Sequence, residues 1–153
     1  MSRHKVTIVV IAVLIILLQF IRPERNISPI KTSGSFDSLL HPPDTVAHLL
    51  QGACADCHSN NTRYPSYASI QPLGWWLNGH IVKGKAALNL DEFSNYSARR
   101  RISKLKMMEE QLRTGKMPLR VYTWLHPKAR LSDPDMALLT HWLNATIDSL
   151  ALQ

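Results

Sequence analysis

The chain has 153 residues, a length that suits one domain, and a formal net charge of +7 at pH 7. Apart from Arg99-Arg100-Arg101 its basic residues are scattered and match no nucleic-acid-binding motif, which excludes nucleic acid as the expected partner. A basic balance of this size is compatible with an ordinary solvated surface, with anionic lipid, or with an acidic protein.

The first segment, Val6 to Ile21, is an apolar run without a charged residue. As a helix it would be about 24 Å long, and the long side chains of Lys5 and Arg22 could reach the interfaces of a bilayer core of about 30 Å. Small residues typical of a signal cleavage site do not follow it. We therefore predict a signal-anchor, an uncleaved transmembrane helix, over residues 1–22.

The rest of the chain is predicted to be helical. Residues 23–40 are polar, with two prolines and no periodicity, which predicts a linker. Helical periodicity follows in four segments, 44–52, 72–84, 97–114 and 133–150, and no segment alternates convincingly as a strand. The last segment starts at Ser132-Asp133-Pro134-Asp135, a capping residue followed by an early proline. The predicted fold class is all-α, with one domain over residues 41–150.

The chemistry of the chain is concentrated in Cys54-Ala55-Asp56-Cys57-His58, which contains its only two cysteines. A thioredoxin-type site needs a preceding strand in a βαβ unit, which this sequence lacks. A structural zinc site needs four ligands, and this motif supplies at most three. Cys-x-x-Cys-His is instead the attachment signature of c-type haem. It predicts one covalently bound haem c, with thioethers from Cys54 and Cys57 and with His58 on the proximal side of the iron.

The second axial ligand has two candidates. Met117, in the loop Gly115–Leu119, is the first, because methionine often completes the coordination of an electron-carrying haem and Pro118 restricts the backbone beside it. His80 is the second, because it shares a helix face with apolar residues, an unusual position for an imidazole without a partner. Met107 and Met108, in the middle of a helix, are assigned to the core or the surface.

Two further groups of residues could lie near a haem. Most of the four tryptophans are expected to pack around the macrocycle, although an indole N–H could also reach a propionate. Arg63 and Tyr64, just after the motif, could reach a propionate as well or could simply face solvent.

The sequence resembles the small bacterial haem-binding domain family over about residues 41–145. The segments that carry the resemblance are Cys54–Pro65, Ile70-Gln71-Pro72 with Trp75-Trp76 and His80-Ile81, Gly115–Leu119 and Tyr122–Pro127. The resemblance implies an exported, membrane-anchored monohaem protein of c type. It implies Cys54 and Cys57 as covalent haem sites, His58 as an axial ligand, and importance for both His80 and Met117. Ser66 stands where the family tends to have tryptophan, which puts an aromatic contact to the haem at this position in doubt.

The order of the parts also resembles class I c-type cytochromes, in which the first and last helices cross and pack. That likeness implies a cytochrome c-like domain in which 44–52 packs on 133–150. We therefore predict an electron carrier rather than an enzyme, working with a redox partner protein. It would be a single-pass protein of the bacterial inner membrane with its domain on the periplasmic side. The alternatives are a haem-based sensor or peroxidase with an open iron site, and a thiol oxidoreductase.

Overall fold

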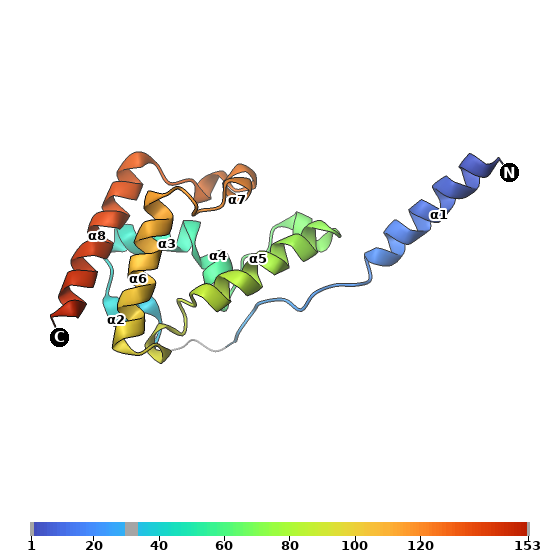
Figure 1. Cartoon of the computed structure of the whole chain (residues 1–153). Coiled ribbons are helices and arrows are strands. Elements are labelled where there is room, and N and C mark those ends of the chain that lie inside the picture. The colour runs from blue at the N-terminus through green and yellow to red at the C-terminus, as the bar shows by residue number, and fades with distance from the viewer. Residues whose placement is uncertain (1, 30–33, 153) are drawn as a thin grey trace.

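The computed structural model describes residues 2–29 and 34–152, and the regular secondary structure of this part of the chain is helical apart from one isolated β-bridge between Ile27 and Asn61 (Figure 1). Its α-helices are α1 (Arg3–Leu18), α2 (Phe36–Leu40), α3 (Asp44–Ala53), α4 (Ala55–His58), α5 (Leu73–Ala87), α6 (Ala98–Arg113), α7 (Arg120–Leu125) and α8 (Asp133–Ala151). Short 3₁₀ helices lie at Ser66–Ser69, Phe93–Asn95 and Pro127–Ala129. The predicted all-α fold is confirmed.

The four periodic segments of the sequence correspond to α3, α5, α6 and α8. The hydroxyl of Ser132 accepts from the backbone N–H of Asp135, and the Asp135 carboxylate accepts from the N–H of Ser132, so the expected cap starts α8. Helix α5 continues to Ala87, past Gly84, where we expected it to end. Helices α2, α4 and α7 were not predicted, since four to six residues are too few to show a helical period.

The hydrophobic core lies where α8 packs on α6 and, less extensively, on α3 (Figure 1). The contact between α3 and α8 is the helix pair that the sequence predicted. The buried side chains of this core are Phe36, Val46, Leu50, Leu88, Leu90, Phe93, Leu105, Leu112, Leu139, Leu143 and Ile147. Helices α3, α6 and α8 therefore share this core, and the other helices apart from α1 are arranged around it.

The end of the predicted linker is part of this core. Residues Phe36–Leu40 form α2, and Phe36 is only 1% exposed, with its ring in edge contact with Phe93 at a centroid distance of 4.9 Å. A single aromatic residue in a polar segment gave no periodic signal, which is why the sequence assigned it to the linker. Residues 30–33 of the predicted linker, and residue 1 of the predicted anchor, lie outside the described part of the chain.

The prediction of a transmembrane helix is wrong. Among the described residues, 2–29 and 34–152, no helix is both long enough and apolar enough to cross a membrane. Helix α1 stops at Leu18 instead of Ile21, so its uncharged part, residues 6–18, is only about 20 Å long at 1.5 Å per residue, against about 30 Å for a bilayer core. The single-pass inner-membrane location with a periplasmic domain, which we derived from this helix, is wrong with it.

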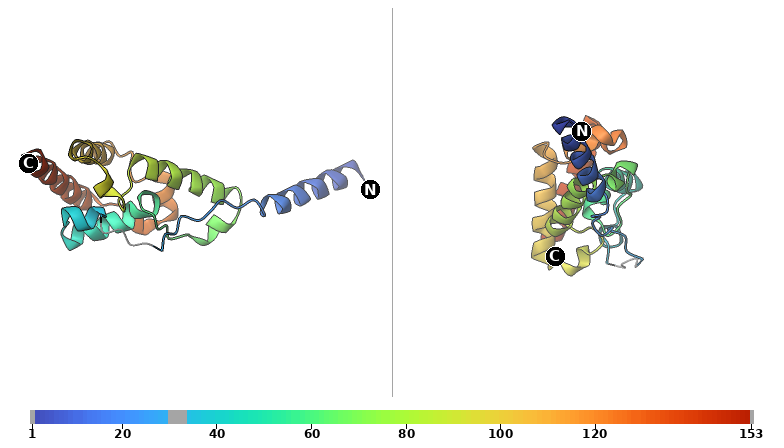
Figure 2. Two further views of the ribbon diagram at one scale, coloured as in Figure 1. Left: turned by 90° about the horizontal axis from the view of Figure 1, so that it is seen from below. Right: turned by 90° about the vertical axis from the view of Figure 1, so that its right-hand side faces the viewer.

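Helix α1 lies apart from the other helices in Figure 1 and in the left view of Figure 2. The residues just after it are attached to the start of α5. The Gln19 side chain donates to the carbonyl of Gln71 at 3.3 Å and accepts from its N–H at 2.9 Å. The indole N–H of Trp75 donates to the carbonyl of Ile21 at 2.8 Å, so this tryptophan holds the N-terminal segment.

Candidate functional site

An apolar cavity of about 280 Å³ lies between α4, the end of α5, α6 and the loop after α6. It is lined by Ala53, Cys54, His58, Ala87, Leu88, Met107, Met108, Gln111, Leu112, Met117 and Pro118. All of these except His58 and Gln111 are apolar, and the volume is near the lower end of typical ligand sites. A larger hollow of about 700 Å³ between residues 24–29 and α5 is lined mostly by polar and charged residues, and it contains none of the predicted site residues.

His58, the last residue of α4, faces this cavity with a defined tautomer. Its Nδ1 lies 3.0 Å from the carbonyl oxygen of Leu88. Because a carbonyl can only accept, Nδ1 must carry the proton, and Nε2 keeps its lone pair. Burial lowers the pKa of His58, against the opposing effect of the bond to Leu88. The imidazole is therefore neutral and oriented, which is the form that binds a metal ion.

The two cysteines of the motif form no disulfide with each other, and only Cys54 lines the cavity. Burial raises the pKa of Cys54 to about 12, and burial together with the Asp56 carboxylate raises the pKa of Cys57 to about 11. Thiol exchange needs a thiolate and hence a lowered pKa. The described residues also contain no group of three or more His, Cys, Asp or Glu side chains arranged to hold a metal ion. The raised pKa values of the two thiols argue against the thiol oxidoreductase.

Met117 and His80 occupy different environments. Met117 lines the cavity, and its loop is held against α6 because the N–H groups of Lys116 and Met117 both donate to the carbonyl of Gln111, at 3.0 and 3.2 Å. His80 does not line the cavity. Its Nδ1 lies 2.8 Å from the carbonyl of Trp76, and its ring lies 4.5 Å from the Trp76 ring. Of the two candidates, only Met117 shares the cavity with His58.

The sequence did not reveal three other residues of this region. Met107 and Met108, which we assigned to the core or the surface, also line the cavity. Leu88, whose carbonyl fixes the His58 ring, lies thirty residues further along the chain. Since a backbone acceptor carries no side-chain signature, no sequence pattern could have identified it.

The comparison with protein families agrees with this geometry. The model of a family described as "Haem-binding domain" matches residues 13–145. The chain belongs to this haem-binding domain family. The resemblance found in the sequence is confirmed, and the match begins well before residue 41, where that resemblance started. Among curated proteins none matches the chain, and among solved structures none matches it either.

This haem-binding domain has haem as its cofactor, and the cavity fits that group. Its apolar walls suit the faces of a macrocycle, and it combines an imidazole whose Nε2 carries a lone pair with a methionine thioether. These are the two ligand types that hold the iron in cytochromes c. His58 and Met117 are therefore the residues that would hold the iron here.

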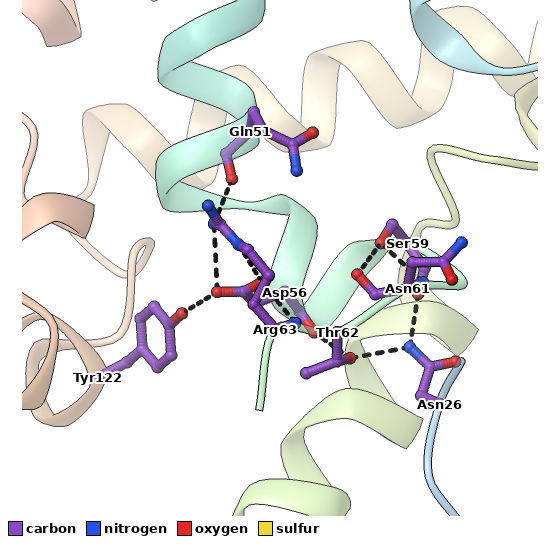
Figure 3. Close-up of polar contacts among 8 residues, drawn as sticks. All are labelled: Asn26, Gln51, Asp56, Ser59, Asn61, Thr62, Arg63 and Tyr122. Atoms are coloured by element: carbon purple, nitrogen blue, oxygen red, sulfur yellow. Dashed lines mark hydrogen bonds and ion pairs between the residues drawn. The ribbon is translucent and has the colours of Figure 1, made fainter. Parts of the chain in front are cut away.

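The haem-binding motif is held in place by hydrogen bonds to the carboxylate of Asp56, a buried residue of the motif itself (Figure 3). The carboxylate accepts from the backbone N–H of Arg63 at 3.1 Å, from its guanidinium at 2.9 Å and from the hydroxyl of Tyr122 at 2.6 Å. Arg63 also donates to the carbonyl of Gln51 in α3. Asp56 thus joins α3, α4 and α7. Arg63, which we considered for a propionate, makes this contact, and its role toward a propionate stays a prediction.

The loop after the motif is tied to the N-terminal segment (Figure 3). The side-chain amide of Asn26 donates to the carbonyl of Ser59 at 2.8 Å and to the hydroxyl of Thr62 at 2.9 Å, and Thr62 in turn donates to the carbonyl of Asp56. The hydroxyl of Tyr64 accepts from the N–H of Asn26 at 2.7 Å, so this tyrosine also connects the loop to the N-terminal segment. The middle of the motif and the loop after it are therefore both anchored by hydrogen bonds.

Gly84 lets α5 approach the motif closely, which leads to a testable expectation. A Cβ at Gly84 would lie 2.5 Å from the carbonyl oxygen of Cys57, whereas a Cβ at Gly79 in the same helix would meet nothing within 4 Å. We expect Gly84→Ala to lower the free energy of unfolding by about 1–2 kcal/mol, because overpacking outweighs the gain in helix propensity. The matched variant Gly79→Ala should raise it by up to about 1 kcal/mol. Urea unfolding followed by circular dichroism tests both, and equal effects would contradict the close approach.

Proposed function

We propose that this haem-binding domain carries one haem c, attached through Cys54 and Cys57, and acts as a one-electron carrier. The observation that supports it is that His58, Cys54 and Met117 all line one apolar cavity. When bound there, haem supplies an iron that gains and loses one electron. The chain supplies the ligands, the orientation and the dry surroundings.

Each residue has a distinct part in this proposal. The hydrogen bond from His58 Nδ1–H to the Leu88 carbonyl makes Nε2 a more basic ligand for a metal ion and fixes the plane of the ring. Met117 supplies a thioether, which favours the reduced state and raises the reduction potential. The apolar lining acts in the same direction, because it disfavours the more highly charged oxidised state.

The composition of the lining supports a carrier over a peroxidase. Besides His58, Gln111 is the only polar residue among the described residues that line the cavity, and no carboxylate lines it. Peroxide chemistry needs a group that accepts and returns a proton beside the iron. An amide does not titrate, so Gln111 cannot do this.

The covalent attachment is tested by mass and absorption. The chain is produced in a host that matures c-type cytochromes, and the purified protein is denatured and weighed. The wild type should keep its colour and weigh as much as the polypeptide plus one haem. The double variant Cys54→Ala/Cys57→Ala should lose the covalent adduct, while Met107→Leu, on the cavity wall, should keep it. A wild type that loses all its colour on denaturation would contradict the proposal.

A further inference from the structure

Helix α7 presents an exposed apolar surface although its other face is firmly held. Tyr122 is buried and donates to Asp56, and the Arg130 guanidinium donates to the carbonyl of Thr123 at 3.2 Å. On the outer face Val121 is 56% exposed and Trp124 is 73% exposed. A shallow hollow of about 440 Å³ is lined by Arg120, Val121, Thr123, Trp124 and Arg130. We call these five residues the α7 surface.

The α7 surface lies in a segment that carries only positive charge. Residues 111–132 contain five basic residues and no aspartate or glutamate. The basic residues are Arg113, Lys116, Arg120, Lys128 and Arg130, and all five are exposed. Tryptophan and arginine are the residue types that most often dominate the energy of protein interfaces. A positive field of this kind attracts a partner whose surface is negative and speeds its encounter.

The α7 surface is also close to the cofactor cavity. Arg120 follows Met117 by three residues, a span of at most about 11 Å of extended chain, and Pro118 between them lines the cavity. The hydrogen bond from Tyr122 to Asp56 connects α7 to the helix of the haem-binding motif. A protein seated on Trp124 would therefore lie beside the site of electron exchange.

We propose that the α7 surface docks an acidic partner protein, with Trp124 as the apolar anchor and Arg120 and Arg130 as its charged flanks. This rests on the proposed electron-transfer function, because an exchange of electrons requires the partner to come close to the cavity. The carboxylates of the partner would pair with the two arginines around the indole. Anionic lipid and nucleic acid are the competing occupants of a basic surface, and the test separates them.

The probe is an acidic copper protein of the plastocyanin class, added in its oxidised form to the ¹⁵N-labelled, oxidised haem-loaded protein. Because both proteins are oxidised, no electron moves and the amide shifts report binding alone. The test variants are Arg120→Glu/Arg130→Glu and Trp124→Ala. The matched control is Arg99→Glu/Lys106→Glu, which makes the same change in net charge at exposed positions of α6.

The wild type should bind at low ionic strength, with its largest shifts in residues 116–131, and binding should weaken as salt is added. The α7 charge reversal should raise the Kd about tenfold or more, and the α6 reversal less than about threefold. Trp124→Ala should raise the Kd about tenfold without changing its dependence on salt. Equal effects of the two reversals, shifts centred elsewhere, or no binding would overturn the proposal.

Two further measurements are needed. One distinguishes an acidic protein from lipid and DNA as the occupant of the α7 surface, and the other separates failure of the carrier function from failure of docking. Vesicles containing phosphatidylglycerol and a short DNA duplex are titrated under the same conditions, and tighter binding of either one through the α7 surface would overturn the choice of an acidic protein. The covalent haem is verified by mass before any titration. A colourless chain would therefore count against the carrier function, and a haem-loaded chain that ignores the probe would count against docking alone.

Discussion

Met117→Ala is expected to leave the haem attached but to open the sixth coordination position of its iron. Attachment depends on the two thiols of the motif, whereas Met117 contributes a thioether from the loop held by the carbonyl of Gln111. Alanine has no atom that can bind iron, so carbon monoxide should bind the reduced variant readily. The absorption spectrum before and after addition of the gas measures this, and the wild type should change little.

The control for Met117→Ala is His80→Ala, in which the other candidate ligand is removed. His80 is bonded through Nδ1 to Trp76 and does not line the cavity, so its replacement should leave the wild-type spectrum unchanged. Rapid binding of carbon monoxide by the wild type would contradict the closed carrier and favour a sensor or peroxidase. Opening of the site by His80→Ala instead of Met117→Ala would contradict the ligand assignment.

Met117 and His80 could not be distinguished as iron ligands from the sequence. Both residues were compatible with the motif, because ligand type does not reveal distance in space. The structure separates them because α6 and its following loop bring Met117 back to His58, while α5 turns His80 toward Trp76. A candidate ligand that is 59 residues from His58 along the chain is positioned by helix packing, which periodicity does not encode.

The helices themselves were predictable to the extent that they are long. The apolar periods of α3, α5, α6 and α8 are visible because each helix buries one side in the core or against the motif. Helices α4 and α7 owe their form to tertiary contacts, above all the hydrogen bond between Asp56 and Tyr122. Short segments of this kind cannot be recognised from local pattern alone.

The wrong prediction for the N-terminal segment has a similar cause. Counting apolar residues extended the helix to Ile21, but α1 ends at Leu18. The side chain of Gln19 is engaged by Gln71, and the carbonyl of Ile21 accepts from Trp75. These contacts connect residues more than fifty positions apart, so the segment after α1 is held by α5 instead of continuing the helix.

Asp56→Ala is expected to be among the most destabilising single substitutions in this domain. Asp56 is only 7% exposed, and its carboxylate accepts from the backbone and guanidinium of Arg63 and from Tyr122. Its removal leaves a buried hydroxyl and a backbone N–H without their acceptor. We expect the free energy of unfolding to fall by about 2–5 kcal/mol, because each buried donor that is left without an acceptor costs about 1–3 kcal/mol.

Two comparisons separate this network from ordinary surface charge. Tyr122→Phe removes one hydrogen bond but keeps the stacked ring, at a centroid distance of 4.3 Å from His126, and should cost about 1–2 kcal/mol. Glu109→Ala breaks the ion pair with Arg113, an arginine whose side chain is 65% exposed, and should cost at most about 1 kcal/mol. Urea unfolding of the haem-loaded proteins gives all three values on one scale.

The cost in free energy of unfolding should be largest for Asp56→Ala, smaller for Tyr122→Phe and smallest for Glu109→Ala. If Asp56 holds the motif through several acceptor contacts at once, its removal must cost more than the loss of the single Tyr122 hydroxyl, and both must exceed the exposed pair. Asp56→Ala and Glu109→Ala with equal costs would mean that the loop after the motif and α7 stay in place without the carboxylate. The geometry of Cys54, Cys57 and His58 would then depend on α5 and on the contacts of Asn26 instead.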